Sequence, residues 1–160
     1  MSKQIRSAFP LVFGLAVVLA GSGAVQAADN WMGAWKLNLA KSKYSPGPAP
    51  KSNTAKYEAS EGGMKAVTDG VSTDGKPTHT EFTAKYDGKD YAYKGNPNVD
   101  TIAVKRIDAD TYEATLKSKG KVTMTSRNVV SKDGKTRTQT QAGTDAQGKA
   151  VSNTVVYDRQ

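Results

Sequence analysis

Most of the chain is a series of short runs in which apolar and polar side chains alternate. In the first such run after residue 53, Ala55, Tyr57 and Ala59 share one face, and Lys56 and Glu58 share the other. Alternation over about four to eight residues is typical of a β-strand with one buried face. The same pattern predicts further shared faces: Thr80, Phe82, Ala84 and Tyr86; Tyr91 and Tyr93; Ile102 and Val104; Tyr112, Ala114 and Leu116; Val122, Met124, Ser126, Asn128 and Val130; and Val151, Asn153, Val155 and Tyr157.

Turn signals separate these runs at regular intervals. They are mostly pairs of a polar residue and glycine, such as Asp74-Gly75, Asp87-Gly88 and Asp133-Gly134, and glycine supplies the positive φ that tight hairpin turns require. Their spacing, mostly about 8 to 15 residues, is typical of antiparallel strands in a sandwich or barrel. The run from Thr136 to Gln141 offers no apolar face.

These patterns predict an all-β protein, an antiparallel up-and-down β-barrel of about 8–10 strands whose closure leaves no unpaired edge. Several inward positions are Ala, Thr, Ser or Asn, which fill space poorly. Two interpretations remain open: a tightly closed sandwich that needs only small residues, or a barrel with a cavity lined partly by polar groups. The inward tyrosines favour the cavity, because a buried hydroxyl needs a partner or water.

The first predicted strand contains both tryptophans of the chain. Trp31 and Trp35 flank Gly33, and apolar and polar side chains alternate as far as Leu37 and Leu39. We interpret this strand as a plug at one end of the barrel. The segment that follows has three prolines between residues 46 and 50, which predicts an extended connection.

Residues 1–27 have the organisation of a secretory signal peptide. Lys3 and Arg6 precede an apolar run, and small residues lead to a predicted cleavage site after Ala27. The alternative, an uncleaved membrane anchor, is disfavoured because the apolar run is short for a bilayer. Without cysteine there is no lipoprotein anchor either. The sequence thus predicts an exported protein, periplasmic or secreted, with no stable membrane anchor.

The remainder, residues 28–160, has 160 − 27 = 133 residues and predicts a single domain with one core. Without the two signal-peptide cations the formal net charge falls from +8 to +6. A basic balance can indicate nucleic acid, anionic surfaces or acidic ligands. The lysines are spread over turns and strands with no run of five, which indicates solvated faces and excludes a nucleic-acid-binding tract.

The sequence contains no catalytic or metal-binding pattern. His79 is the sole histidine and there is no cysteine, so neither a zinc or copper site nor a nucleophilic triad is expected. Most carboxylates suited to acid–base pairing lie in Asp-Gly turns, where they have local hydrogen-bonding roles. We therefore expect a protein that is not an enzyme and that uses no metal ion or cofactor.

The two ends of the predicted domain resemble a known superfamily. Gly33-Ala34-Trp35 at the start of a first strand is similar to the Gly-x-Trp signature of the calycins, which include lipocalins and fatty-acid-binding proteins, and the last strand, ending in Tyr157-Asp158-Arg159, is similar to the closing strand of fatty-acid-binding proteins. The resemblance implies a structural role for Gly33, Trp35 and Arg159, with Trp35 closing one end of the barrel and Arg159 packed across its indole ring. The opening string also resembles small exported bacterial proteins of unassigned function.

The chain departs from fatty-acid-binding proteins in two respects. The arginine that holds a carboxylate two residues before the last-strand tyrosine is Val155 here, and the proline-rich connection replaces the helical lid. Arg106 follows Ile102 and Val104 on the same alternating face and is a candidate internal cation; the alternative is a strand-end arginine turned to solvent.

These observations give two functional hypotheses. The first is an exported lipocalin-like protein that binds a small, largely apolar molecule inside the barrel. The second is a non-enzymatic cell-envelope protein that binds an anionic polymer or a protein through its lysine-rich surface, and it predicts a filled barrel. For the first, the expected ligand-binding residues are Phe82, Tyr86, Tyr91, Tyr93, Arg106, Met124 and Tyr157.

Overall fold

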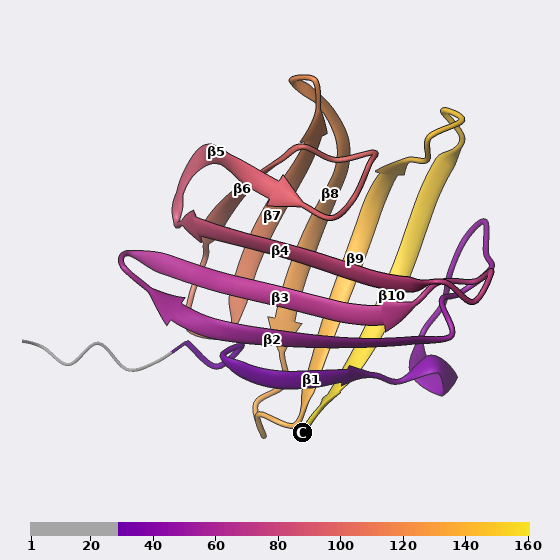
Figure 1. Ribbon diagram of the computed structural model, residues 1–160. Helices are drawn as coiled ribbons and strands as arrows, with labels where there is room; N and C mark the ends of the chain where they lie inside the picture. Colours follow the sequence, from indigo (N-terminus) through magenta and orange to yellow (C-terminus); the bar gives the residue numbers. More distant parts are fainter. Residues whose placement is uncertain (1–28) are drawn as a thin grey trace, which may run out of the picture.

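The computed structural model describes residues 29–160, so the predicted signal peptide at residues 1–27 lies outside the described residues. The described chain forms one closed antiparallel barrel of ten strands (Figure 1). The strands are β1 (Gly33–Leu37), β2 (Ser52–Ser60), β3 (Gly63–Val71), β4 (Pro77–Lys85), β5 (Asp87–Lys94), β6 (Thr101–Arg106), β7 (Thr111–Ser118), β8 (Lys121–Val130), β9 (Thr136–Thr144) and β10 (Ala150–Arg159), with one short 3-10 turn, η1 (Leu39–Lys41).

Each strand pairs with the next one in sequence, and β1 also pairs with β10. This is the up-and-down barrel that the strand and turn pattern predicts, at the upper end of the expected strand count. In Figure 1, β1 to β5 form a front wall that crosses the back wall of β6 to β10 at a steep angle. Among residues 29–160, no helix is long and apolar enough to span a membrane.

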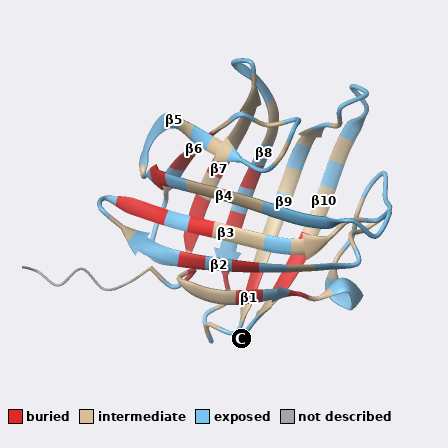
Figure 2. Ribbon diagram, in the orientation of Figure 1, coloured by how far each residue is buried: buried red, intermediate tan, exposed pale blue. Residues whose placement is uncertain are grey.

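The core lies on the inner face of the barrel, and every strand except β5 contributes at least one buried residue to it (Figure 2). Buried positions alternate with exposed ones along β2 and β8, as the sequence pattern predicts. The prediction is wrong at Val122, which is 56% exposed. A bulge in the β7–β8 pairing lets Leu116 pair with Met124 while Lys117 pairs with Val122, and one extra residue reverses the alternation.

One end of the barrel is closed by the two tryptophans. Trp31 and Trp35 are fully buried, and the Trp35 indole N–H donates to the backbone carbonyl of Trp31 at 2.8 Å. The Arg159 guanidinium lies 4.2 Å from the centroid of the Trp35 ring and donates to the carbonyls of Gly134 and Met32. Cation, indole and N-terminal backbone therefore form one plug.

Gly33 makes room for this plug. Its φ is +107°, and a Cβ there would lie 3.0 Å from Nη1 of Arg159, so a side chain at this position meets both backbone strain and the guanidinium. The backbone conformation and the nearby guanidinium thus explain why glycine occupies the first position of the Gly-x-Trp motif in this chain.

The opposite end of the barrel is the mouth, where the turns after β5, β7 and β9 meet. Beside it, Lys43 forms a bridge to Thr154, and Ser45 accepts from the backbone of Ser152. The start of the proline-rich connection therefore continues the path of β1 along β10 before the chain turns into β2.

Candidate functional site

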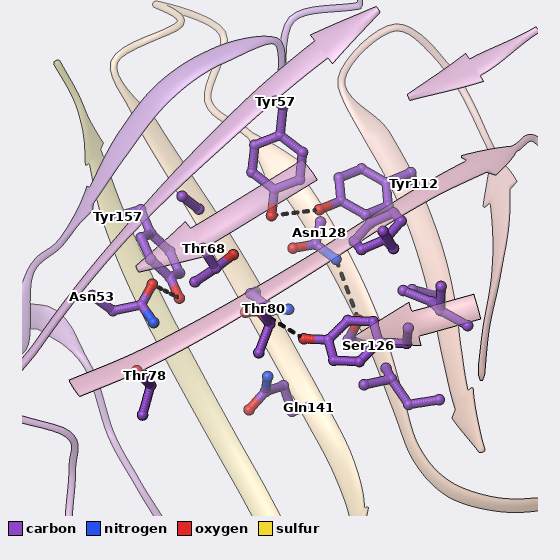
Figure 3. A pocket seen from close by; sticks show the side chains of 17 residues that line it. Asn53, Tyr57, Thr68, Thr78, Thr80, Tyr112, Ser126, Asn128, Gln141 and Tyr157 are labelled. Carbon is purple, nitrogen blue, oxygen red and sulfur yellow. Dashed lines mark hydrogen bonds between the residues drawn. The ribbon is translucent and has the colours of Figure 1, made fainter. Parts of the chain in front are cut away.

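The barrel encloses a cavity of about 230 Å³ (Figure 3). At roughly 30 Å³ per water molecule, that space corresponds to about eight waters. The lining side chains come from every strand except β1; they are Asn53, Ala55, Tyr57, Thr68, Thr78, Thr80, Phe82, Tyr93, Ile102, Tyr112, Ala114, Leu116, Ser126, Asn128, Gln139, Gln141 and Tyr157.

The lining divides into an apolar half and a polar half. Strands β4 to β7 supply most of the apolar side chains, which are Phe82, Tyr93, Ile102, Ala114 and Leu116, although Thr78, Thr80 and Tyr112 of the same strands add hydroxyl groups. The arc from β8 through β10 to β3 supplies the polar half, which includes Asn53, Thr68, Ser126, Asn128, Gln139 and Gln141. Because adjacent strands contribute each half, the cavity has one face suited to hydrocarbon and one suited to hydrogen bonds.

The floor of the cavity, which we define as Tyr57, Tyr112 and Asn128, rests on a buried arginine. Arg137, on β9, is 1% exposed. Its Nη1 donates to the Tyr57 hydroxyl at 3.0 Å, to the Tyr112 hydroxyl at 3.2 Å and to Oδ1 of Asn128 at 2.8 Å. Arg137 does not itself line the cavity, because the floor residues lie between its guanidinium and the open space.

Aromatic rings surround the Arg137 guanidinium. Its Cζ lies 4.3 Å from the Tyr157 ring centroid, 4.8 Å from that of Tyr57 and 5.8 Å from that of Trp35. Contacts of this kind stabilise a desolvated cation by about 2 kcal/mol. None of the ion pairs within residues 29–160 involves Arg137, and an arginine stays protonated in proteins. The barrel thus carries a buried positive charge between its plug and its cavity.

Three of the residues expected to bind ligand lie in the cavity wall. Phe82 and Tyr93 stack with ring centroids 5.9 Å apart, and the Tyr93 hydroxyl donates to Thr80 at 3.2 Å. Tyr157 donates to Asn53 at 3.4 Å. The structure therefore brings these three aromatic residues into one site.

The other four lie elsewhere. Tyr86 packs edge-on against Trp31 at the closed end. Arg106 is held outside the cavity by an ion pair with Asp29, with Nε 2.6 Å from Oδ1. Tyr91 and Met124 line two separate surface hollows.

Two surface hollows adjoin the cavity. Tyr91 lines one of them, next to Phe82, where β4 and β5 diverge after only two paired positions; its hydroxyl donates to Asp87 at 2.9 Å. Met124 lines the other, a hollow of about 560 Å³ at the mouth, and Leu116 lines both this hollow and the cavity. The mouth hollow therefore lies directly next to the cavity, on the side opposite Trp35.

The sequence interpretation missed three parts of the site. They are the floor residues, the amide side chains of β9, and Arg137. The run from Thr136 to Gln141 lacks an apolar face, yet every strand of a closed barrel turns one face inward. Arg137, Gln139 and Gln141 share a face by simple alternation. That periodicity was the available signal for a polar interior.

Metal-binding clusters are absent from the described part of the chain: no group of three or more His, Asp or Glu side chains lies close enough to hold an ion. The single histidine, His79, lies on the outer face and pairs with Asp69, with Nδ1 2.6 Å from Oδ1.

We expect the barrel to lose stability steeply in alkali. Burial raises the pKa of Tyr112 and of Tyr157 above the ordinary value for tyrosine. Above about pH 10 the unfolded state releases these protons while the folded state keeps them, so stability falls as pH rises. Each tyrosine contributes about 1.4 kcal/mol per pH unit, or about 3 kcal/mol per unit for both.

Urea unfolding at about pH 9, 10 and 11 measures this slope. A Tyr157→Phe variant serves as control and should show a shallower slope, because it removes one of the tyrosines whose pKa burial raises; Tyr86 and Tyr93 belong to the same group. A free energy of unfolding that is constant over this range would show that the two hydroxyls are not buried in the folded state.

No protein-family model matches the chain, and no curated protein sequence matches it significantly. Among solved structures, the chain is similar to the zebrafish ileal bile acid-binding protein in complex with cholic acid. The two are 12% identical with a TM-score of 0.48, over 82% of this chain and 99% of that one.

At that level of similarity, no conclusion about function passes from one protein to the other. The fold assignment rests on the chain itself: ten antiparallel strands close into one barrel, and a last-strand arginine stacks on the tryptophan of the Gly-x-Trp motif. The chain has a calycin-like fold.

Proposed function

We propose that this chain is an exported binding protein that holds a small amphipathic molecule inside the barrel. The observation that carries the proposal is the divided cavity, with aromatic and aliphatic side chains on one side and amides and hydroxyls on the other. The N-terminal sequence supports export. The lysine-rich surface alternative predicts a filled barrel, which the cavity of about 230 Å³ does not fit.

The size of the cavity limits the ligand. Known small-molecule pockets span about 300–1,000 Å³, so the ligand is a compact molecule unless part of it extends into the mouth hollow past Leu116. Burying about 150 Å² of apolar ligand surface, roughly one aromatic ring, contributes about 4 kcal/mol, which corresponds to about millimolar affinity. Tighter binding therefore requires hydrogen bonds from the polar half.

A side chain that fills the cavity should abolish binding. Ala114 is buried on the cavity wall, and in an Ala114→Phe variant the phenyl ring takes space that the ligand needs. We expect at least about a tenfold loss of affinity, about 1.4 kcal/mol, measured by native mass spectrometry of co-purifying molecules and by the fluorescence gain of a hydrophobic dye.

The matched control is Ala103→Phe. Ala103 lies on β6 between the buried Ile102 and Val104, so its side chain points outward and the same substitution should leave binding unchanged. If the wild-type protein carries no small molecule and gives no dye fluorescence, or if Ala114→Phe binds as well as wild type, the barrel interior is not a binding site.

A further inference from the structure

The cavity floor has an unused phenolic proton. The hydroxyls of Tyr57 and Tyr112 point toward one another and share one hydrogen bond at 3.2 Å (Figure 3), while both oxygens accept from Arg137. Two hydroxyls that share one bond use one of their two protons. Since both side chains line the cavity, the remaining O–H is available to a group inside it.

Asn128 adds a second donor beside it. Its Oδ1 is occupied by Arg137 at 2.8 Å, so its amide nitrogen faces away from the guanidinium. That nitrogen has two hydrogens, and its one contact among the described residues is a long 3.3 Å bond to Ser126. Arg137 therefore fixes the polarity of the floor: the acceptor atoms face the cation, and donors remain for the cavity.

The electrostatics of the cavity favour a negative charge at this position. Within residues 29–160, the titratable groups that line the cavity are Tyr57, Tyr93, Tyr112 and Tyr157, and no carboxylate is among the lining side chains. Arg137 lies directly beneath the floor without an acidic partner among residues 29–160. A water molecule at the floor can accept the donated hydrogen bonds but leaves the charge of Arg137 uncompensated. An anionic oxygen accepts the hydrogen bonds and also compensates the charge.

We propose that the floor binds the ionised oxygen of a small ring-bearing organic acid, held by the Tyr57–Tyr112 pair and the Asn128 amide, and that it favours the ionised form over the neutral one. This inference rests on the proposed function and deepens it by naming the charge and the orientation of the ligand. The acidic oxygen lies at the floor, and the ring packs between Phe82 and Leu116. Arg137 acts through the floor residues and does not touch the ligand.

The sign of a pKa change tests this directly. An apolar cavity raises the pKa of a phenol, because burial disfavours the charged form, whereas donors above a buried cation lower it. The probe is 4-nitrophenol, whose phenolate has its own visible absorption band. We expect a pH titration of the bound probe to give a pKa lowered by about one unit or more relative to the free probe, that is, at least about a tenfold preference for phenolate.

Three variants assign the effect. Tyr57→Phe/Tyr112→Phe removes the hydroxyls and Arg137→Met removes the charge, and each should abolish most of the shift. Tyr91→Phe is the control, because its hydroxyl lies outside the cavity and bonds to Asp87, and it should keep the full shift. Since the wild-type titration decides the sign by itself, the test does not depend on the folding of any variant.

The outcomes separate this proposal from the one on which it rests. A bound probe whose pKa rises or stays unchanged overturns the anion site and leaves ligand binding intact. A probe that fails to bind, or that binds Ala114→Phe equally well, overturns both. If the probe's pKa is lowered, competition by benzoate but not by benzyl alcohol would show that the site also binds carboxylates. If benzoate does not compete, the site binds phenolates but not carboxylates.

Discussion

An Arg137→Ala variant is expected to lose about 3 kcal/mol of unfolding free energy, measured by urea denaturation monitored through tryptophan fluorescence. The truncation removes a side chain that packs against three aromatic rings, and it leaves a cavity whose cost adds to the lost contacts. It also leaves the Tyr57 and Tyr112 hydroxyls and Oδ1 of Asn128 without their shared donor, and unsatisfied buried acceptors cost about 1–3 kcal/mol each unless they pair again.

Arg137→Met separates the packing contribution from the charge. Methionine keeps much of the volume and so leaves little cavity; like alanine it removes the donor to Tyr57, Tyr112 and Asn128, but it also removes the cost of burying a charge, which opposes that loss. Arg137 also carries a desolvation cost that no acidic partner offsets. We therefore expect the Met variant to fold within about 1 kcal/mol of wild type.

A Met variant as unstable as the Ala variant would show that the cation holds the floor together through its hydrogen bonds. An Ala variant within about 0.5 kcal/mol of wild type would show that Arg137 is not packed in the core. The expected pattern, a costly truncation and a tolerated apolar replacement, would mean that the charge is dispensable for the fold, which is the condition under which a role in binding becomes testable.

The strand pattern predicts this fold well because closure of a barrel depends on local features. Alternation identifies which residues face inward, and Gly-containing turns determine which strands are neighbours. Val122 shows the limit of the method: the bulge that moves it outward depends on the pairing partner, and nothing in the sequence of β8 alone reveals the extra residue.

The candidate site is harder to predict. The direction in which a side chain points, inward or outward, follows from its own strand, but its position between the plug and the mouth depends on the whole barrel. Tyr86 and Tyr93 both face inward by alternation, yet Tyr86 lies at the plug and Tyr93 in the cavity wall. Arg106 illustrates the same point at a strand end, where Asp29, far away in sequence, captures it. These positions depend on how far each strand extends past its neighbours, and alternation carries no information about that.

Arg137 shows a different kind of limit. Apolar residues mark an interior because water disfavours them, so a strand with Arg, Gln and Gln on one face looks solvated on both sides. Only the requirement of closure, together with a partly polar interior, reveals the inward face of β9. In this barrel the polar inward face of β9 marks the cavity as well as the inward aromatic residues do, because Gln139 and Gln141 line it together with Phe82 and Tyr93.

At the opposite side of the same cation, Trp35→Ala should be the most destabilising single substitution, with a loss of about 3–5 kcal/mol as expected for a buried tryptophan. Trp35 is fully buried, donates to the carbonyl of Trp31 and contacts both Arg137 and Arg159. The loss is a large fraction of the 5–15 kcal/mol of total stability that is typical of a domain. Leu39→Ala is the control from the same segment, since Leu39 is 44% exposed and should change stability by about 0.5 kcal/mol or less.

A double-mutant cycle with Arg159→Ala then measures whether the plug is one unit. If the guanidinium is held by the indole, the two substitutions should be less costly together than their sum by about 1 kcal/mol, in the range of a partly exposed cation–π contact. Strict additivity would mean that Arg159 is held by the backbone carbonyls of Gly134, Met32 and Asn30 alone. Since the cavity lies beyond Arg137 from this plug, a Trp35→Phe variant, which keeps a ring beneath the cation, should retain ligand binding even where it loses stability.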